Sequence, residues 1–247
     1  MDLKIKDVAE LLNISETTVR RWLNKGKIPA YRLQHQYRFS RLEIENWMMN
    51  CRLKKNSKQP HPAKEEQLYL FQDQKKTGQE KKTGMQQFSL FRAIHHGGIL
   101  YDLQARSKET VIRETMEIIS RDLGFDPSII SDLFMDREKL MSTALNNGVA
   151  VPHMRDFLFK GTTDMIVVVF PKHPINWGAL DKYPIHTLFF LFAFDDKRHL
   201  NLLAKLAHLS SDKKALKLLR SKPNKKTLLD YIKEREAKIV RSTDSLQ

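Results

Sequence analysis

The sequence predicts an α/β domain, with a mixed sheet flanked by helices, joined to a small N-terminal domain of short helices and a hairpin. Two continuously apolar stretches, 164–170 and 186–193, have the composition of strands that are buried on both faces of a sheet. Apolar residues recur at helical spacing on either side of these stretches. Between about 54 and 87 this periodicity stops, and Lys, Gln, Pro, Thr and Gly dominate. We therefore expect domains at 1–53 and 88–242, joined by a basic polar linker at 54–87.

Composition and length are typical of a soluble globular protein. Of the 247 residues, 41% are hydrophobic and 29% are charged, which suits two modest domains with cores of their own. No apolar run approaches the roughly 20 residues needed to cross a bilayer, and the first residues do not resemble a signal or transit peptide. We expect a cytoplasmic protein that makes no membrane contact. The single cysteine, Cys51, can form neither an intramolecular disulfide nor a multi-thiolate metal site.

The distribution of charge favours a polyanionic partner for the N-terminal domain. The formal net charge of the chain is +14. Residues 1–58 hold thirteen Lys and Arg against six Asp and Glu, whereas the other 189 residues hold thirty against twenty-three. Both parts therefore carry +7, but the N-terminal part carries it on less than a quarter of the chain. We expect DNA to be a partner.

Two short helices open the N-terminal domain. Apolar residues from Val8 to Leu12 follow helical spacing, and Ser15 has the side chain of an N-cap for a second helix. In that second helix Val19, Trp22 and Leu23 face inward. Gly26 then suits the turn after the helix. Two such helices joined by a three- to four-residue turn form a helix-turn-helix, whose second helix enters the major groove. The outward positions of this helix are Glu16, Thr17, Thr18, Arg20 and Arg21.

A hairpin and a third helix follow. Residues 30–33 and 37–39 are β-prone, basic and aromatic, and they flank the polar segment 34–36. This arrangement predicts the wing of a winged helix-turn-helix. Residues 40–43, Ser-Arg-Leu-Glu, form a capping box that opens a helix carrying Leu42 and Trp47.

Residues 2–50 resemble the excisionase and MerR-like winged helix-turn-helix family. The matching stretches are Val8–Leu12, Ser15–Trp22, Gly26–Ala30 and the hairpin from Tyr31 to Phe39, although His35-Gln36 stands where the family commonly has glycine. Because one small module makes few phosphate contacts, we also expect a homo-oligomer. The resemblance implies that DNA is contacted by Thr17, Thr18, Arg20 and Arg21 on the second helix and by Arg32 and Arg38 on the wing.

The C-terminal domain begins with two predicted helices. The first starts after Ser107 and ends at Gly124, and the second is capped by Asp126-Pro127. Strands are expected at 148–151, 164–170 and 186–193, with further helices beginning near His199, Asp212 and Lys226.

One histidine in this domain has the setting of a nucleophile. His153 directly follows a predicted buried strand and Pro152, which fixes its own φ and holds Val151 extended. An imidazole near neutral pH has a nitrogen that can attack a phosphoryl group. Nearby guanidinium groups would stabilise the charge on the transferring oxygens, and Arg137 and Arg155 are the candidates. The hypothesis requires a ring that is presented to a donor next to such a guanidinium.

Residues 88–242 resemble the fructose, mannitol and nitrogen-type enzyme IIA domains of the bacterial phosphotransferase system. The resemblance implies the enzyme IIA type 2 fold, phosphorylation of His153 by a small histidine-phosphorylated carrier protein, and His199 as its hydrogen-bonding partner. Ala144 and Asn146 stand where the family usually has glycine, and Met154 where it has a small residue. The matching stretches are Arg137-Glu138, Ser142-Thr143, Gly148–His153, Ile175–Asp181, Phe189–Ala193, His199-Leu200 and Leu203–Ala207.

Three functions fit these features. The first is a regulator of the nitrogen-type branch whose DNA binding responds to phosphorylation of His153, since no permease segment is present. The second is a phosphocarrier or transferase whose helix-turn-helix only tethers or oligomerises it. The third is an architectural DNA-binding protein whose IIA domain serves as an interaction platform, for example for other regulatory proteins. We expect no cofactor and no metal site, because the remaining histidines show no ligand spacing such as His-Glu-x-x-His. In the C-terminal domain these are His95, His96, His173, His186 and His208.

Overall fold

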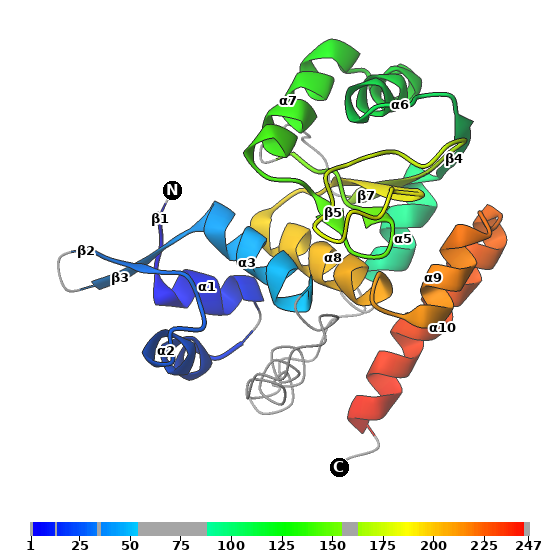
Figure 1. The fold of residues 1–247 in the computed structure, drawn as a ribbon. Coiled ribbons are helices and arrows are strands. Elements are labelled where there is room, and N and C mark those ends of the chain that lie inside the picture. The colour runs from blue at the N-terminus through cyan, green and yellow to red at the C-terminus, as the bar shows by residue number, and fades with distance from the viewer. Residues whose placement is uncertain (1, 13, 34–35, 54–87, 155–162, 245–247) are drawn as a thin grey trace. The chain divides into compact units, whose positions relative to one another are not determined.

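The computed structural model describes residues 2–12, 14–33, 36–53, 88–154 and 163–244, and it divides into two compact units, 1–81 and 82–247 (Figure 1). Each unit is described by itself. The predicted linker, Arg155 and the tip of the wing at 34–35 lie outside the described residues, as does the side chain of Cys51. The domain boundaries at 53 and 88 therefore stay a prediction.

The N-terminal unit combines helices with a small antiparallel sheet, in which β3 lies between β1 and β2. The hairpin pairs Tyr31 with Arg38 and Leu33 with Gln36, so the predicted wing is present. In chain order the elements are β1 (Asp2–Leu3), α1 (Ile5–Leu12), α2 (Glu16–Asn24), β2 (Tyr31–Leu33), β3 (Gln36–Ser40) and α3 (Arg41–Leu53).

Local sequence signals explain the boundaries of α2. The Ser15 hydroxyl accepts a hydrogen bond from the Thr18 amide, as expected of an N-cap. Gly26 follows the helix with a φ of +61°, a left-handed conformation that favours glycine. The inward face of α2 packs into a small core, where the rings of Trp22 and Trp47 lie 5.6 Å apart. The Trp47 indole also donates to the Lys27 carbonyl at 2.6 Å, which ties α3 to the turn after α2.

The C-terminal unit is built on a mixed five-stranded sheet of order β4-β7-β8-β6-β5. Strands β4 and β7 are parallel, as are β6 and β8, whereas β7–β8 and β5–β6 are antiparallel. The elements are α5 (Ser89–Gly97), β4 (Ile99–Leu103), α6 (Lys108–Leu123), α7 (Pro127–Leu140), β5 (Ala144–Leu145), β6 (Val149–Ala150), β7 (Met165–Pro171), β8 (Thr187–Phe192), α8 (Asp196–Leu209), α9 (Lys213–Arg220) and α10 (Lys225–Asp244).

Helices cover both faces of this sheet. Figure 1 shows α6 and α7 on one face and α5, α8 and α10 on the other. Every residue of β7 and β8 is buried, as the two continuously apolar stretches predict. The predicted α/β class, with a mixed sheet between helices, is therefore confirmed.

The helix ends of this unit follow their caps. Ser107 and Thr110 form a capping box at the start of α6, and Gly124 ends that helix in a left-handed conformation. The Asp126 carboxylate accepts the first amides of α7, with Pro127 as its first residue. Helix α8 begins at Asp196, so His199 lies in its first turn. Helix α5 and strands β4 and β5 were not expected from the sequence. In the described part of the chain, no helix combines the length and the hydrophobicity that crossing a bilayer requires.

A buried carboxylate joins the first and last helices of the C-terminal unit. Glu236 of α10 accepts hydrogen bonds from the Leu90 and Phe91 amides at the start of α5. It also pairs with the Lys205 ammonium of α8 at 2.6 Å, and Lys205 donates to the Ser89 hydroxyl. The free amides of α5, which no residue of its own caps, are therefore satisfied from the other end of the unit.

Candidate functional site

The backbone around His153 continues the sheet beyond the end of β6. His153 forms a parallel bridge with Leu191 of β8, and the Leu191 amide donates to the Pro152 carbonyl at 2.9 Å. The His153 ring turns back on its own chain, so that Nδ1 lies 2.8 Å from the Val151 carbonyl. Pro152 and the strand pairing thus fix both the backbone and the ring of this residue.

This contact determines which ring nitrogen can react. A carbonyl oxygen only accepts hydrogen bonds, so Nδ1 must carry a proton to form the 2.8 Å contact. In the neutral imidazole the lone pair then belongs to Nε2. Nε2 is therefore the ring nitrogen of His153 that could act as a nucleophile.

His199 is the predicted residue that the structure brings to His153. The two ring centroids lie 4.9 Å apart, with an angle of 69° between the ring planes. His199 is in the first turn of α8, where its amide donates to the Asp195 carbonyl. His153 itself stays in the sheet, through its bridge to Leu191, whereas the sequence predicted that it would leave the core there.

The structure describes one of the two predicted arginines. Arg137 lies in the last turn of α7, is 2% exposed, and donates to the Met141 carbonyl at 3.0 Å. Its role beside His153 stays a prediction, as does that of Arg155, which is outside the described residues. The expectation that the chain has no metal site stays a prediction.

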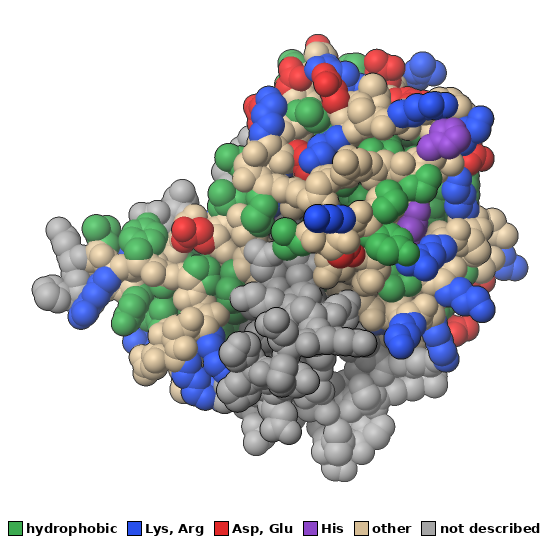
Figure 2. Space-filling view, in the orientation of Figure 1, with side chains coloured by type: hydrophobic (Ala, Val, Ile, Leu, Met, Phe, Trp, Pro, Cys, Tyr) green, Lys and Arg blue, Asp and Glu red, His purple; other side chains and the backbone are tan. Residues whose placement is uncertain are grey.

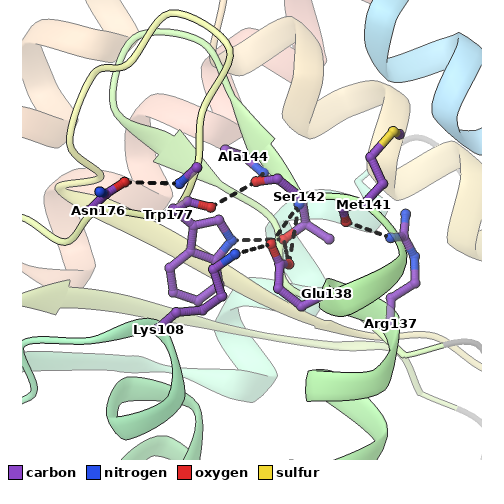
Figure 3. A network of polar contacts seen from close by, with 10 residues as sticks. Lys108, Arg137, Glu138, Met141, Ser142, Ala144, Asn176 and Trp177 are labelled. Atoms are coloured by element: carbon purple, nitrogen blue, oxygen red, sulfur yellow. Dashed lines mark hydrogen bonds and ion pairs between the residues drawn. The ribbon is translucent and has the colours of Figure 1, made fainter.

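Next to Arg137, the Glu138 carboxylate is the centre of a buried polar network (Figure 3). It accepts the Thr143 amide at 3.1 and 3.2 Å and the Thr143 hydroxyl at 2.5 Å. The Lys108 ammonium lies 3.0 Å from the same carboxylate. The Trp177 indole donates to the Thr143 hydroxyl at 3.2 Å, and the Ser142 hydroxyl donates to the Trp177 carbonyl at 2.9 Å.

This network reaches His153 through the backbone. Glu138 binds the amide and the hydroxyl of Thr143. The carbonyl of the same residue accepts the Val151 amide at 3.0 Å. Val151 is in turn the residue whose carbonyl accepts the His153 ring. Sequence reasoning assigned no role to Glu138, Thr143 or Trp177. The signal available for them was their occurrence in the stretches that carry the family resemblance.

The three positions that depart from the family pattern fit their surroundings. Neither Ala144 nor Asn146 has a positive φ, so neither needs glycine. The left-handed conformations of this turn fall on Asn147, at +70°, and Gly148, at +79°. Met154 is 5% exposed and belongs to the core of the unit.

In the N-terminal unit, α2 presents most of the residues predicted to contact DNA. Thr17, Arg20 and Arg21 are exposed. Thr18 is not: the prediction that it faces outward is wrong, because it is 9% exposed and its hydroxyl lies 3.0 Å from that of Ser15. Thr18 helps to complete the N-terminal cap of α2, and its contact with DNA stays a prediction.

The wing also carries its predicted arginines. Arg32 is exposed, and Arg38 is half-buried and donates to the Tyr37 carbonyl at 3.4 Å. The side chains of Tyr31, Leu33 and Tyr37 are exposed as well, so the hairpin presents cations among large apolar groups. A contact of any of these residues with DNA stays a prediction.

Family models match both units. Residues 93–235, more than half of the chain, match the family described as phosphoenolpyruvate-dependent sugar phosphotransferase system, EIIA 2. The chain belongs to this EIIA family. Residues 3–52 match a helix-turn-helix domain. The two assignments agree with the folds described above and with the resemblances in the sequence.

Relatives of the EIIA unit are nitrogen regulatory proteins. The chain is 30% identical to the nitrogen regulatory protein of Klebsiella oxytoca over 53% of this chain and 82% of the relative. The crystal structure of the nitrogen regulatory protein IIA-Ntr from Neisseria meningitidis superposes with a TM-score of 0.50 at 25% identity, covering 58% of this chain and 94% of that one. The chain is also 48% identical to the transcriptional repressor DcmR of Methylorubrum extorquens over 44 residues. This match covers 17% of each protein.

Proposed function

We propose that this EIIA protein is a DNA-binding transcriptional regulator that accepts a phosphoryl group on Nε2 of His153. The donor is a histidine-phosphorylated carrier protein of the phosphotransferase system. The observation that carries the proposal is the 2.8 Å contact between Nδ1 and the Val151 carbonyl, since it leaves the lone pair on Nε2. In this proposal residues 1–53 bind DNA, residues 88–242 accept the phosphoryl group, and the chain acts as a homo-oligomer.

The transfer step moves one phosphoryl group between two imidazoles. The lone pair on His153 Nε2 attacks phosphorus and forms a new N–P bond, while the N–P bond to the carrier's histidine breaks. The bonding electrons return to the carrier's ring nitrogen. His153 keeps its Nδ1 proton, which continues to bind the Val151 carbonyl.

Negative charge on the phosphoryl oxygens needs compensation. His199 is placed to compensate part of this charge. It lies in the first turn of α8, where the partial positive charge of a helix N-terminus is located. We assign it a hydrogen-bonding role toward the phosphoryl oxygens. Arg137 and Arg155 are the candidates for neutralising this charge, because guanidinium groups stabilise the transferring oxygens.

The N-terminal unit supports DNA binding through α2 and the wing. Thr17, Arg20 and Arg21 face solvent on α2, and Arg32 and Arg38 are on the hairpin. The ion pair of Arg20 with Glu16 is exposed at 3.7 Å, so releasing it for a phosphate costs about 0.5 kcal/mol. Phosphorylation adds about −1.5 to −2 charges. This cannot reverse a net charge of +14, so the switch must act on a local contact or a subunit surface.

Phosphorylation is tested with the full chain and carrier protein loaded from phosphoenolpyruvate. We expect the wild type to gain one phosphoryl group by intact mass, and His153→Ala to gain none. His199→Gln should slow the transfer by about 10- to 1000-fold without preventing it. His96→Ala, which changes an exposed histidine of α5, is the matched control and should behave like the wild type. A phosphoryl group on the His153→Ala variant would overturn the assignment of His153 as the acceptor.

DNA binding is tested by comparing the phosphorylated and unphosphorylated protein on genomic fragments enriched by the protein itself. Arg20→Ala with Arg21→Ala should abolish the selection of a sequence. A difference in affinity between the two phosphorylation states, absent in His153→Ala, distinguishes the regulator from an architectural protein. If the double arginine variant selects the same fragments with the same affinity, the helix-turn-helix is a tether and the alternative of a phosphocarrier is correct.

A further inference from the structure

A short segment of the C-terminal unit holds its entire excess of positive charge. Residues 213–226 contain seven Lys and Arg and no Asp or Glu. Their charge of +7 equals the net charge of all 189 residues after position 58, so the remaining residues of that part balance to zero. The segment spans α9 and the start of α10, and Figure 2 shows Lys and Arg side chains gathered over these two helices.

Several of these cations have no carboxylate partner. Lys213, Lys214, Lys217 and Lys226 are exposed and form no ion pair with any residue in the described ranges. Neighbouring carboxylates are already engaged. Asp212 caps α9 and pairs with Arg235, and Asp102 pairs with Lys222.

The cations are placed against the preference of the helices. Neither α9 nor α10 has an acidic residue in its first turn, and both begin with two lysines. Positive charge at a helix N-terminus is unfavourable because the helix dipole has the same sign there. Stability alone therefore does not explain these lysines, whereas binding of a polyanion would.

Their spacing produces a linear stripe. Lys213, Lys217 and Arg220 are four and three residues apart, so they lie on one face of α9 about 5 Å apart along its axis. Ala215 and Leu219, on the opposite face, are buried in the unit. Such a stripe matches the regular row of phosphates along one strand of a duplex.

The chemistry of the surface separates DNA from other polyanions. A helix that binds membranes inserts large apolar side chains between the lipids. The exposed large apolar residues of the described chain include none between 213 and 226. A DNA site also benefits from the helix-turn-helix on the same chain, since a first contact raises the local concentration of DNA at a second.

We propose that α9 and the start of α10 form a second DNA contact surface, which binds the phosphate backbone without reading sequence. This proposal depends on the proposed DNA binding only for the identity of the partner. In it, α2 selects the sequence, and the EIIA unit adds affinity for the DNA backbone.

The test measures binding of the full chain to a duplex by fluorescence anisotropy between about 50 and 200 mM salt. The variant replaces Lys213, Lys217 and Arg220 by Gln. We expect affinity at low salt to fall about 10- to 100-fold and the slope of log K against log salt to become shallower by about 2 to 3. The matched control replaces Arg106, Arg121 and Lys172 by Gln. These residues are also exposed cations of the C-terminal unit, and the control should lose less than about 3-fold.

Each outcome decides between the proposals. If the α9 variant binds DNA like the control variant, the second surface is wrong, whatever the effect of the Arg20 and Arg21 changes. If the arginine changes have no effect but the α9 variant loses affinity, the second surface stands and the helix-turn-helix assignment fails. Vesicles of phosphatidylserine and phosphatidylcholine provide the remaining arm. Vesicle binding lost in the α9 variant, with DNA binding intact, would overturn DNA as the partner.

Discussion

The surroundings of His153 and the surface of α2 hold their functional groups in opposite ways. The His153 ring is bound to a backbone carbonyl, in a region connected by hydrogen bonds to the Glu138 network. On α2, the Arg20 side chain is 62% exposed and its partner Glu16 is 48% exposed. Forming a covalent bond requires a nitrogen held in one direction, whereas binding to phosphates tolerates cations that move. The two units thus differ in how closely neighbouring groups hold these side chains, where their proposed chemistry differs.

The largest expected effect is the difference in stability lost when a buried carboxylate is removed and when an exposed one is removed. Glu138→Ala leaves the Lys108 ammonium and the Thr143 amide without their acceptor in a site where the carboxylate is 2% exposed. We expect the free energy of unfolding, from urea denaturation, to fall by about 3 to 5 kcal/mol. Glu16→Ala breaks the exposed pair on α2 and should cost less than about 1 kcal/mol.

A milder change tests whether Glu138 also orients the ring. Glu138→Gln keeps the shape of the side chain but not its charge, so this variant should fold. We expect a smaller share of the His153 rings to keep the proton on Nδ1, as seen in nitrogen-15 chemical shifts. Equal losses of stability for Glu138→Ala and Glu16→Ala, or an unchanged His153 spectrum in Glu138→Gln, would remove the contrast between the two regions.

The second prediction compares two glycines with positive φ. A Cβ on Gly148 would lie 2.5 Å from Cδ2 of His186 and 3.1 Å from the Pro184 carbonyl, whereas a Cβ on Gly26 would meet nothing within 4 Å. Gly26→Ala should therefore cost about 1 kcal/mol for its backbone conformation alone, and Gly148→Ala about 2 to 4 kcal/mol. Thermal unfolding of both variants measures the difference. Similar losses would mean that the turn beside His186 adapts as easily as the open one.

The smallest predicted effect is a dependence of stability on pH. Burial lowers the pKa of the His186 imidazole, and the charge of Arg220 lowers it further, although the hydrogen bond to the Asn147 carbonyl acts in the opposite direction. Below the ordinary histidine pKa of about 6.5 the unfolded chain therefore takes up more protons than the folded one. We expect the free energy of unfolding to decrease as pH falls below this value.

His186→Gln should remove this part of the pH dependence, whereas His96→Gln, at an exposed position of α5, should leave it unchanged. Urea titrations at several pH values between about 5 and 8 would show the difference. Parallel curves for the wild type and His186→Gln would contradict the prediction.

Features set by neighbouring residues could be predicted from the sequence. The helix starts at Ser15, Ser107 and Asp126 were correct because each is decided within a few residues. Helix α5 was missed because its start is satisfied by Glu236, which is distant in sequence. The place of His153 within the sheet was missed for a similar reason, since the bridge to Leu191 depends on strand pairing.

The site shows the same division between local and distant causes. The type and position of His153 and His199 were readable in the sequence, and their ring centroids do lie 4.9 Å apart. The Val151 carbonyl that fixes the tautomer was not readable, because backbone groups carry no residue-specific signal. Thr18 failed in the other direction: helical periodicity placed it outside, while its hydroxyl contacts the hydroxyl of Ser15.

The position of Glu236 has a consequence for how the C-terminal unit is made. This carboxylate in α10 supplies the acceptors for the first amides of α5, near the opposite end of the unit. A growing polypeptide therefore cannot complete α5 in its final setting until residue 236 has left the ribosome. Chains released earlier would leave the first amides of α5 without these acceptors.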